Sequence, residues 1–130
     1  MKTEKSFTLN VYTPERLFLT DDVESLVFST PDGQRGILKN HMAAVFAVEC
    51  GVLTARVGNT QTDYAVSDGF LEVEHNVVNV YVNNCNQGED PAAARAEAEA
   101  FRRRERSGLR AHRRNEIHLV RILAGTRKKR

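Results

Sequence analysis

The chain has 130 residues, of which 41% are hydrophobic and 28% charged, and it contains two cysteines. This length supports one compact core and is too short for two independent ones. No run approaches the roughly 18 apolar residues of a membrane span, and residues 1–10 lack the apolar centre of a signal peptide. We therefore expect a single domain with an appendage, made and kept in the cytosol.

The charge is distributed unevenly along the chain. Residues 1–90 hold 6 Lys and Arg against 13 Asp and Glu, whereas residues 91–130 hold 13 against 4. A segment as basic as the second is attracted to acidic partners through a field that salt weakens. This charge is compatible with three kinds of partner: nucleic acid, an anionic membrane surface and an acidic protein.

Short β-branched and aromatic runs recur in the first ninety residues and predict strands. They cover residues 7–12, 23–30, 51–57, 62–66, 69–73 and 77–82. Apolar residues alternate with polar ones, so one face of each strand is predicted to be buried and the other exposed to solvent. A tight turn is predicted at His75 and Asn76. We expect an antiparallel β-sandwich over residues 1–88.

The remaining residues, 89–130, are predicted to form a basic helical hairpin. Asp90 suits a helix N-cap and Pro91 the first helical position, so a first helix is expected over about 91–106. Gly108 suits the left-handed residue that ends a helix, and a second helix is expected over about 109–127. The predicted fold class is thus mainly β with an α appendage: an antiparallel β-sandwich followed by a two-helix hairpin.

The first predicted helix has a thin apolar seam made of Ala94, Ala98 and Phe101. Burial contributes roughly 25 cal/mol per Å² of apolar surface, so these side chains are predicted to hold the hairpin weakly. We expect an arm that can detach from the sandwich. The alternative is a pair of helices that form a permanent lid on one sheet.

The sequence gives little support to an enzyme. The four histidines form no HExxH pattern, and no Ser or Cys lies in a nucleophile motif. Cys50 and Cys85 lie far apart and outside any CxxC spacing, so both are interpreted as small apolar side chains of the core. We predict no catalytic residue, no metal site and no cofactor.

Two stretches resemble the epsilon subunit of F-type ATP synthases. They read YTPERLFLTDDVESLVFSTPDGQRGILKNHMAAVFAVECGVL, residues 12–53, and YAVSDGFLEVEHNVVNVYV, residues 64–82. The family's TPER motif, its G-x-x-GIL loop followed by a histidine, and its AVSxGFLEV strand occur in the same order here. The two predicted C-terminal helices agree as well. The Arg-rich ending, residues 101–123, is similar to the alternative, ion-pumping form sometimes called N-ATPase.

The sequence also departs from the family pattern. Lys39 stands at the loop proline, Gln34 stands where an acidic residue is common, and Asp68 replaces a glycine. Members that bind ATP carry an Asp-x-x-Arg-Ala run, whereas Asp90 lies two residues too far from Arg95 here. We therefore predict no nucleotide site, and expect the contacts of the loop to be altered.

The resemblance implies a non-catalytic rotor subunit of the central stalk. Such a sandwich lies between the gamma subunit and the membrane ring, peripheral to the cytoplasmic face of a bacterial inner membrane. The implied ring-facing loop contains Gln34, Arg35, Lys39, Asn40, His41 and Met42. The alternative for this loop is an ordinary solvated turn.

The resemblance also implies that the helical arm can enter the catalytic head, made of alpha and beta subunits, and hinder ATP hydrolysis. A basic arm would be attracted to acidic surface there. The candidate regulatory residues are Arg102, Arg103, Arg104, Arg106, Arg113, Arg114 and Arg121. The alternative is a solvated basic face without a partner.

The main rival function is a small β-domain whose basic arm binds nucleic acid electrostatically. The arm has the charge for phosphate contacts. Its only aromatic residue is Phe101, so base stacking is weakly supported, and the acidic first ninety residues would repel a duplex. We therefore expect no nucleic-acid partner.

Overall fold

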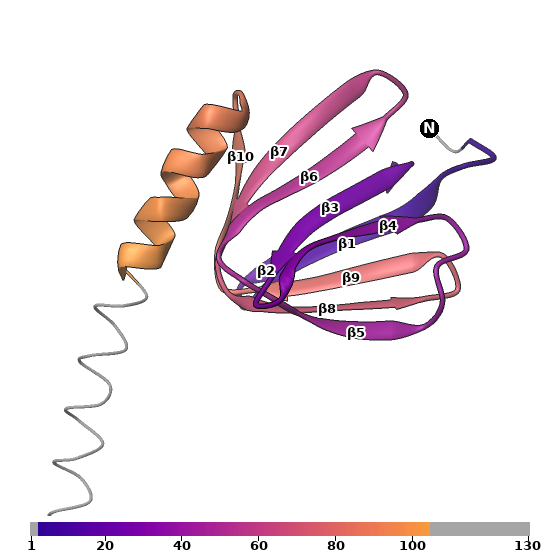
Figure 1. The fold of residues 1–130 in the computed structure, drawn as a ribbon, viewed down its shortest axis with the longest axis horizontal. Helices are drawn as coiled ribbons and strands as arrows, with labels where there is room; N and C mark the ends of the chain where they lie inside the picture. Colours follow the sequence, from indigo (N-terminus) through magenta and orange to yellow (C-terminus); the bar gives the residue numbers. More distant parts are fainter. Residues whose placement is uncertain (1–2, 105–130) are drawn as a thin grey trace, which may run out of the picture.

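A computed structural model describes residues 3–104, which form two packed β-sheets followed by a helix (Figure 1). The described strands are β1 (Phe7–Thr13), β2 (Arg16–Val23), β3 (Ser25–Thr30), β4 (Gly33–Leu38), β5 (Ala44–Val48), β6 (Gly51–Val57), β7 (Thr60–Val66), β8 (Gly69–Glu74), β9 (Val77–Val82) and β10 (Cys85–Gly88). Helical residues run from 91 to 104, the last residue described. The predicted fold class, mainly β with an α appendage, is confirmed.

Each sheet has five strands. Sheet A has the order β2-β1-β9-β8-β5, and sheet B has the order β10-β7-β6-β3-β4. The sequence predicted antiparallel pairing, which holds for every neighbouring pair except β1 and β9. A tight turn cannot join two parallel neighbours, and residues 14–76 lie between β1 and β9 in the chain.

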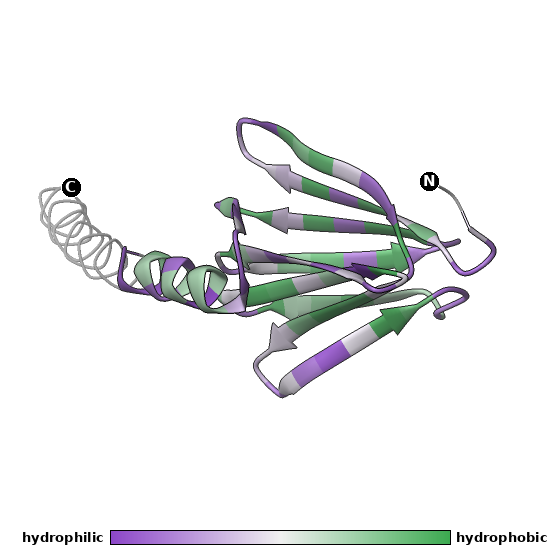
Figure 2. Ribbon diagram, turned by 90° about the horizontal axis from the view of Figure 1, so that it is seen from above, coloured by the Kyte–Doolittle hydropathy of each residue, from purple (hydrophilic) through white to green (hydrophobic). Residues whose placement is uncertain are grey.

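The core lies between the sheets and follows the predicted alternation. Phe7, Leu9 and Val11 of β1 are at most 3% exposed, and Val78 and Val80 of β9 are fully buried. Figure 2 shows how hydrophobic and hydrophilic residues alternate along the strands. The period-two pattern therefore identified the inward face correctly.

Two predictions, one from the family resemblance and one from the strand pattern, were wrong in detail. The loop expected over 34–42 is strand for most of its length, because β4 is an edge strand in which only Ile37 is buried and the alternation is absent. The single strand expected over 23–30 is divided at Glu24, where the chain passes from sheet A to sheet B. Exposed edge strands carry little hydrophobic signal, and a change of sheet carries none.

The tight turn predicted between β8 and β9 is confirmed. His75 and Asn76 have φ values of 51° and 61°. Two successive residues with positive φ are typical of the type I′ turn, whose twist matches that of the flanking strands. Asparagine accepts this conformation more readily than most residues.

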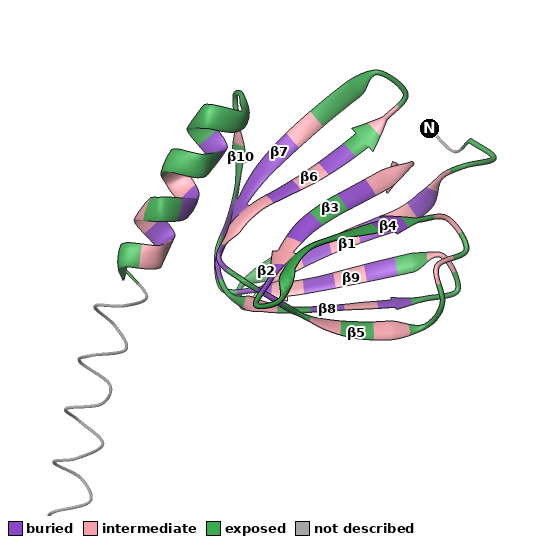
Figure 3. Cartoon of the chain, viewed as in Figure 1, coloured by how far each residue is buried: buried purple, intermediate pink, exposed green. Residues whose placement is uncertain are grey.

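The helix begins where the sequence predicted. The backbone N–H of Ala93 donates to the Asp90 side chain at 2.7 Å, so Asp90 caps the first turn. The predicted seam is buried, with Ala94, Ala98 and Phe101 at 0%, 4% and 2% exposure. Figure 3 shows that the helix lies beside β10 and carries buried positions among exposed ones. The predicted stop at Gly108 and the second helix lie outside the described residues.

Within residues 3–104, the helical segment is too short and too polar to cross a lipid bilayer.

Candidate functional site

The six predicted ring-facing residues lie along one exposed edge of sheet B. Gln34 and Arg35 are near the start of β4, and residues 39–42 follow its end. At about 3.3 Å per strand residue, Gln34 and Leu38 are roughly 13 Å apart. The structure therefore spreads the predicted set along an edge, which we call the β4 edge (residues 34–42), and does not gather it in one loop.

The end of the β4 edge is fixed to the turn between β8 and β9. The N–H of Asn40 donates to Oδ1 of Asn76 at 2.6 Å, and Nδ2 of Asn76 donates to Oδ1 of Asn40 at 3.2 Å. The Asn76 carbonyl accepts from the N–H of Thr8 at 2.9 Å. Nζ of Lys39 also donates to the Glu4 carbonyl at 2.6 Å. These bonds hold an otherwise exposed turn in one position.

We expect Asn76→Gly to loosen this turn. Glycine accepts the φ of 61° at this position, so the substitution removes the side-chain bonds to Asn40 without backbone strain. Loss of a hydrogen bond worth about 1 kcal/mol should speed hydrogen exchange of the Asn40 amide by about fivefold to tenfold. His75→Gly is the matched control, because that side chain is 89% exposed. Equal exchange rates in the two variants would contradict this role for Asn76.

The β4 edge also exposes apolar groups. Leu38 is 65% exposed and Met42 is 77% exposed. Nδ1 of His41 lies 2.7 Å from the Met42 carbonyl, and the His41 ring packs edge-on to Phe46 at 6.0 Å. His41 thus lies in the turn after β4, and the edge carries exposed apolar side chains as well as the cationic Arg35 and Lys39.

Gln34 lies close to the helix. It lines a hollow of about 280 Å³ together with Ser29 on β3 and with Arg95 and Arg102 on the helix. The start of the β4 edge therefore adjoins the arm, whereas its other end adjoins the β8–β9 turn.

The described part of the predicted regulatory arm is partly fixed to the sandwich. Nη2 of Arg102 donates to the Cys50 carbonyl at 2.7 Å, and Nη1 pairs with Glu99 at 2.9 Å. Arg104 lies over the Phe101 ring, 4.9 Å from its centroid, and Arg103 is exposed. The other candidates lie outside the described residues: Arg106, Arg113, Arg114 and Arg121. Most of the ending that is similar to the N-ATPase form, residues 101–123, lies outside them as well.

A second, smaller apolar cluster lies beneath the helix. Cys50 and Ala65 pack against Ala98 and Phe101. Sγ of Cys50 donates to the Ala98 carbonyl at 3.2 Å. The helix also approaches β10 closely, because a Cβ at Gly88 would lie 2.8 Å from that of Ala94. The prediction that both cysteines are small core side chains is confirmed, since both are buried and neither forms a disulfide.

Sequence reasoning missed an aromatic row on the outer face of sheet A. Tyr12 of β1 stacks on Tyr81 of β9 at 5.2 Å, and Tyr81 stacks on Phe70 of β8 at 4.8 Å. Phe70 is nevertheless 48% exposed. The available signal was the alternation in β8, where Phe70, Glu72 and Glu74 share the outward face.

A ladder of polar side chains crosses the same face beside the aromatic row. Oγ1 of Thr20 donates to Asn10 at 2.7 Å, Nδ2 of Asn10 to Asn79 at 3.0 Å, and Nδ2 of Asn79 to Glu72 at 3.1 Å. The Tyr81 hydroxyl also donates to Oε1 of Glu72 at 3.1 Å. Desolvation raises the pKa of Tyr81, and the bond to Glu72 raises it further. The ladder therefore fixes the Glu72 carboxylate in place.

The described residues contain no group of three or more His, Cys, Asp or Glu side chains placed to hold a metal ion. The surfaces on which residues converge are the β4 edge, the helix contact and the outer face of sheet A. The first and the last expose apolar side chains beside charged ones, whereas the helix contact is packing within the chain.

The fold and these surfaces define a small β-sandwich module with a helical appendage and broad contact surfaces. Residues 6–88 match the family described as ATP synthase, delta/epsilon chain, beta-sandwich domain. The chain belongs to this family.

Similar proteins carry the name ATP synthase epsilon chain. That of Synechocystis sp. is 39% identical over 64% of this chain and 61% of its own length. The chloroplastic chain of Atropa belladonna is 36% identical over 65% and 64%, and that of Prochloron didemni is 36% identical over 82% and 78%. The matches to the first two span less than two thirds of those relatives.

Two solved assemblies contain chains of similar fold. One is the mitochondrial ATP synthase of Euglena gracilis, with a TM-score of 0.61, 19% identity and 76% coverage of each chain. The other is the central stalk and c-ring of the Tetrahymena thermophila mitochondrial ATP synthase, with a TM-score of 0.53, 20% identity and coverage of 61% of this chain and 64% of that one. At these identities the likeness supports the fold.

Proposed function

We propose that this chain is a non-catalytic central-stalk subunit of a rotary ATP synthase. It binds a gamma-type subunit and the foot of a membrane ring, peripherally on the cytoplasmic side of a bacterial inner membrane. The observation that carries the proposal is the family's β-sandwich over residues 6–88, followed by a helix held on the sandwich by a narrow seam. A dense hydrogen-bonded sandwich is suited to passing torque between two partners.

The ring contact is assigned to the β4 edge. Its exposed apolar residues, Leu38 and Met42, lie on the same edge as the cationic Arg35 and Lys39. An exposed apolar patch with a polar rim is typical of a protein–protein contact. Because the bonds between Asn40 and Asn76 fix the end of this edge, little conformational entropy would be lost on binding.

The arm is assigned a role in hindering ATP hydrolysis. Deleting residues 91–130 should raise hydrolysis by the purified complex by about fivefold or more, which corresponds to a coupling of about 1 kcal/mol. Co-purification of the tagged full chain with gamma-type, alpha and beta subunits tests the assembly first. A chain that copurifies with none of them would refute the proposal, and unchanged hydrolysis after the deletion would remove the role of the arm.

Substitutions at two neighbouring arginines provide a sharper test, because they should change the rate of ATP hydrolysis in opposite directions. Arg102→Gln removes the bond to the Cys50 carbonyl, so the arm should detach more readily and hydrolysis should fall. Arg103→Gln removes an exposed charge, so attraction to an acidic partner should weaken and hydrolysis should rise. Shifts of the same sign in both variants would contradict a docked arm that inhibits when released.

A further inference from the structure

We propose that the outer face of sheet A docks a segment of another stalk subunit that presents Lys or Arg beside an apolar side chain. We call this surface the acidic face and define it by Tyr12, Phe70, Glu72, Glu74 and Tyr81. The inference rests on the proposed function and adds to it the location and chemistry of one partner contact.

The aromatic row supplies the apolar half of the surface. The two stacked contacts that Tyr81 makes, with Tyr12 and Phe70, join the rings into one rigid unit across β1, β9 and β8. Phe70 is 48% exposed at the end of this row. Rigid aromatic groups that remain partly exposed are the usual anchors of protein interfaces, because little side-chain entropy is lost when a partner covers them.

The charges of the two sheets indicate the sign of the charge on the partner segment. The strands of sheet A carry four carboxylates and one cation: Asp21, Asp22, Glu72, Glu74 and Arg16. The strands of sheet B carry one carboxylate and two cations: Asp63, Arg35 and Arg56. Among the strands, the excess of carboxylates therefore lies in sheet A, and Glu72 and Glu74 place two of them on its outer face. A cationic segment complements this surface, and an anionic one is repelled.

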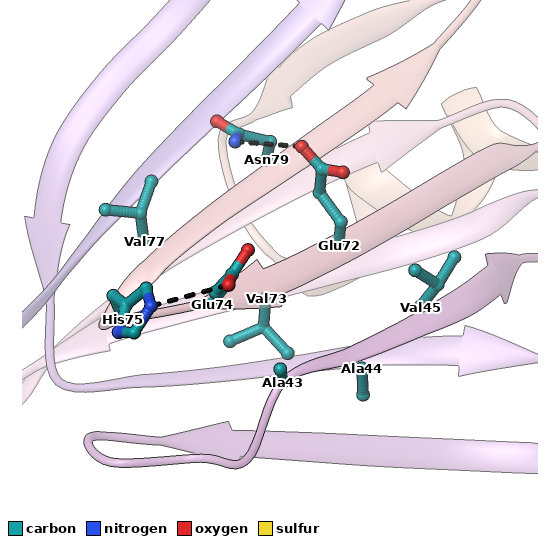
Figure 4. A pocket seen from close by; sticks show the side chains of 9 residues that line it. All are labelled: Ala43, Ala44, Val45, Glu72, Val73, Glu74, His75, Val77 and Asn79. Carbon is teal, nitrogen blue, oxygen red and sulfur yellow. Dashed lines mark hydrogen bonds and ion pairs between the residues drawn. The ribbon is translucent and has the colours of Figure 1, made fainter.

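A hollow on the acidic face provides a place for a cationic side chain. It has a volume of about 560 Å³ and is lined by Glu72 and Glu74 together with apolar residues that include Val45 and Val77 (Figure 4). Asn79 and Tyr81 both bond to Oε1 of Glu72, which leaves Oε2 as an acceptor for a partner's N–H. A carboxylate already held by its neighbours loses little freedom on pairing. Val45, at 71% exposure, provides apolar contact for the stem of a long cationic side chain.

The chain's own basic tail is a competing occupant. Residues 105–130 hold nine Lys and Arg against two Asp and Glu. The helix that precedes them contacts Ala65 on β7 and Cys50 just before β6, which belong to the sheet B side of the molecule. The acidic face is on the other sheet, so we assign it to a separate polypeptide.

The test uses the full chain and the ATPase complex of its source organism, from which the native copy has been removed. The affinity of the tagged chain is measured at low and at near-physiological salt. Phe70→Ala should weaken binding by about thirtyfold, as expected for an aromatic anchor. The double variant Glu72→Gln, Glu74→Gln should weaken it by about tenfold at low salt, and by less when salt screens the charges.

Two matched controls have similar exposure on other surfaces. Val27→Ala changes an apolar side chain of β3 on sheet B that is 37% exposed. Glu49→Gln neutralises an exposed carboxylate between β5 and β6. Both controls should bind within about twofold of the unmodified chain, since surface substitutions outside an interface have small effects.

The other outcomes overturn the inference in distinguishable ways. If the unmodified chain binds and the face variants bind equally well, the acidic face is not the contact, and the proposed function stands. Tighter binding by the Glu72 and Glu74 double variant would identify the chain's own tail as the occupant. Self-association that Phe70→Ala abolishes would identify a second copy. If the unmodified chain does not bind the complex at all, the proposed function itself fails.

Discussion

Replacing Gly69 by alanine is expected to destabilise the sandwich by about 3 kcal/mol or more. Gly69 is the first residue of β8 and pairs with Val82 of β9. A Cβ at this position would lie 1.8 Å from the carbonyl oxygen of Tyr81 and 3.0 Å from the Cα of Val82. These are backbone atoms of a central strand, so neither can move without breaking the ladder. Urea unfolding of the purified variant measures the loss.

Gly36→Ala is the control for this substitution. Gly36 is also a strand glycine, but its added Cβ would meet only the Leu26 carbonyl oxygen at 3.8 Å, an ordinary contact. The urea concentration at the unfolding midpoint of Gly36→Ala should lie close to that of the unmodified chain. If both alanine variants unfold at the same urea concentration, the close approach of β8 and β9 is not what requires glycine at residue 69.

Placing a carboxylate beneath the helix is expected to undock it and expose a buried thiol. In Ala98→Asp the new side chain lies against Cys50 and Ala65, where an uncompensated charge costs about 3 kcal/mol. The helix should then spend more time open, and the reaction of Cys50 with a thiol reagent should accelerate by about a hundredfold. Absorbance at pH 8 during reaction with an aromatic disulfide follows the modification.

The chain contains an internal reference and a matched control for this experiment. Burial between the sheets raises the pKa of Cys85 to about 12, so at pH 8 it stays almost wholly protonated and unreactive. Ala96→Asp adds the same charge at an exposed position of the same helix and should leave the rate unchanged. Equal Cys50 rates in the two variants would mean that the seam does not control access to the thiol.

Most of the inward-facing residues could be predicted from sequence because burial on one side of a strand leaves a period of two. Leu9, Val11, Val78 and Val80 follow this rule directly. The cap at Asp90 and the helix seam were also predictable, because both depend on local chemistry.

The arrangement of the strands was not predictable in the same way. The parallel pairing of β1 with β9 depends on how the whole chain closes, and no local pattern encodes it. β4 and β10 have one buried residue each, so they lack the alternation that marks a strand. The surfaces described above combine residues that are distant in sequence, such as Tyr12 with Tyr81 and Asn40 with Asn76. Only the folded chain brings them together.

The pairing of the first strand with the ninth also has a consequence for biosynthesis. Leu9 has its register partner in Val78, so β1 cannot complete its hydrogen bonding until most of the polypeptide has left the ribosome. Contacts of such long sequence separation slow folding, and until they form, the apolar strand β1 is paired with β2 on one side only. A nascent chain interrupted before residue 77 would expose that strand to aggregation, and the sandwich can close only late in translation.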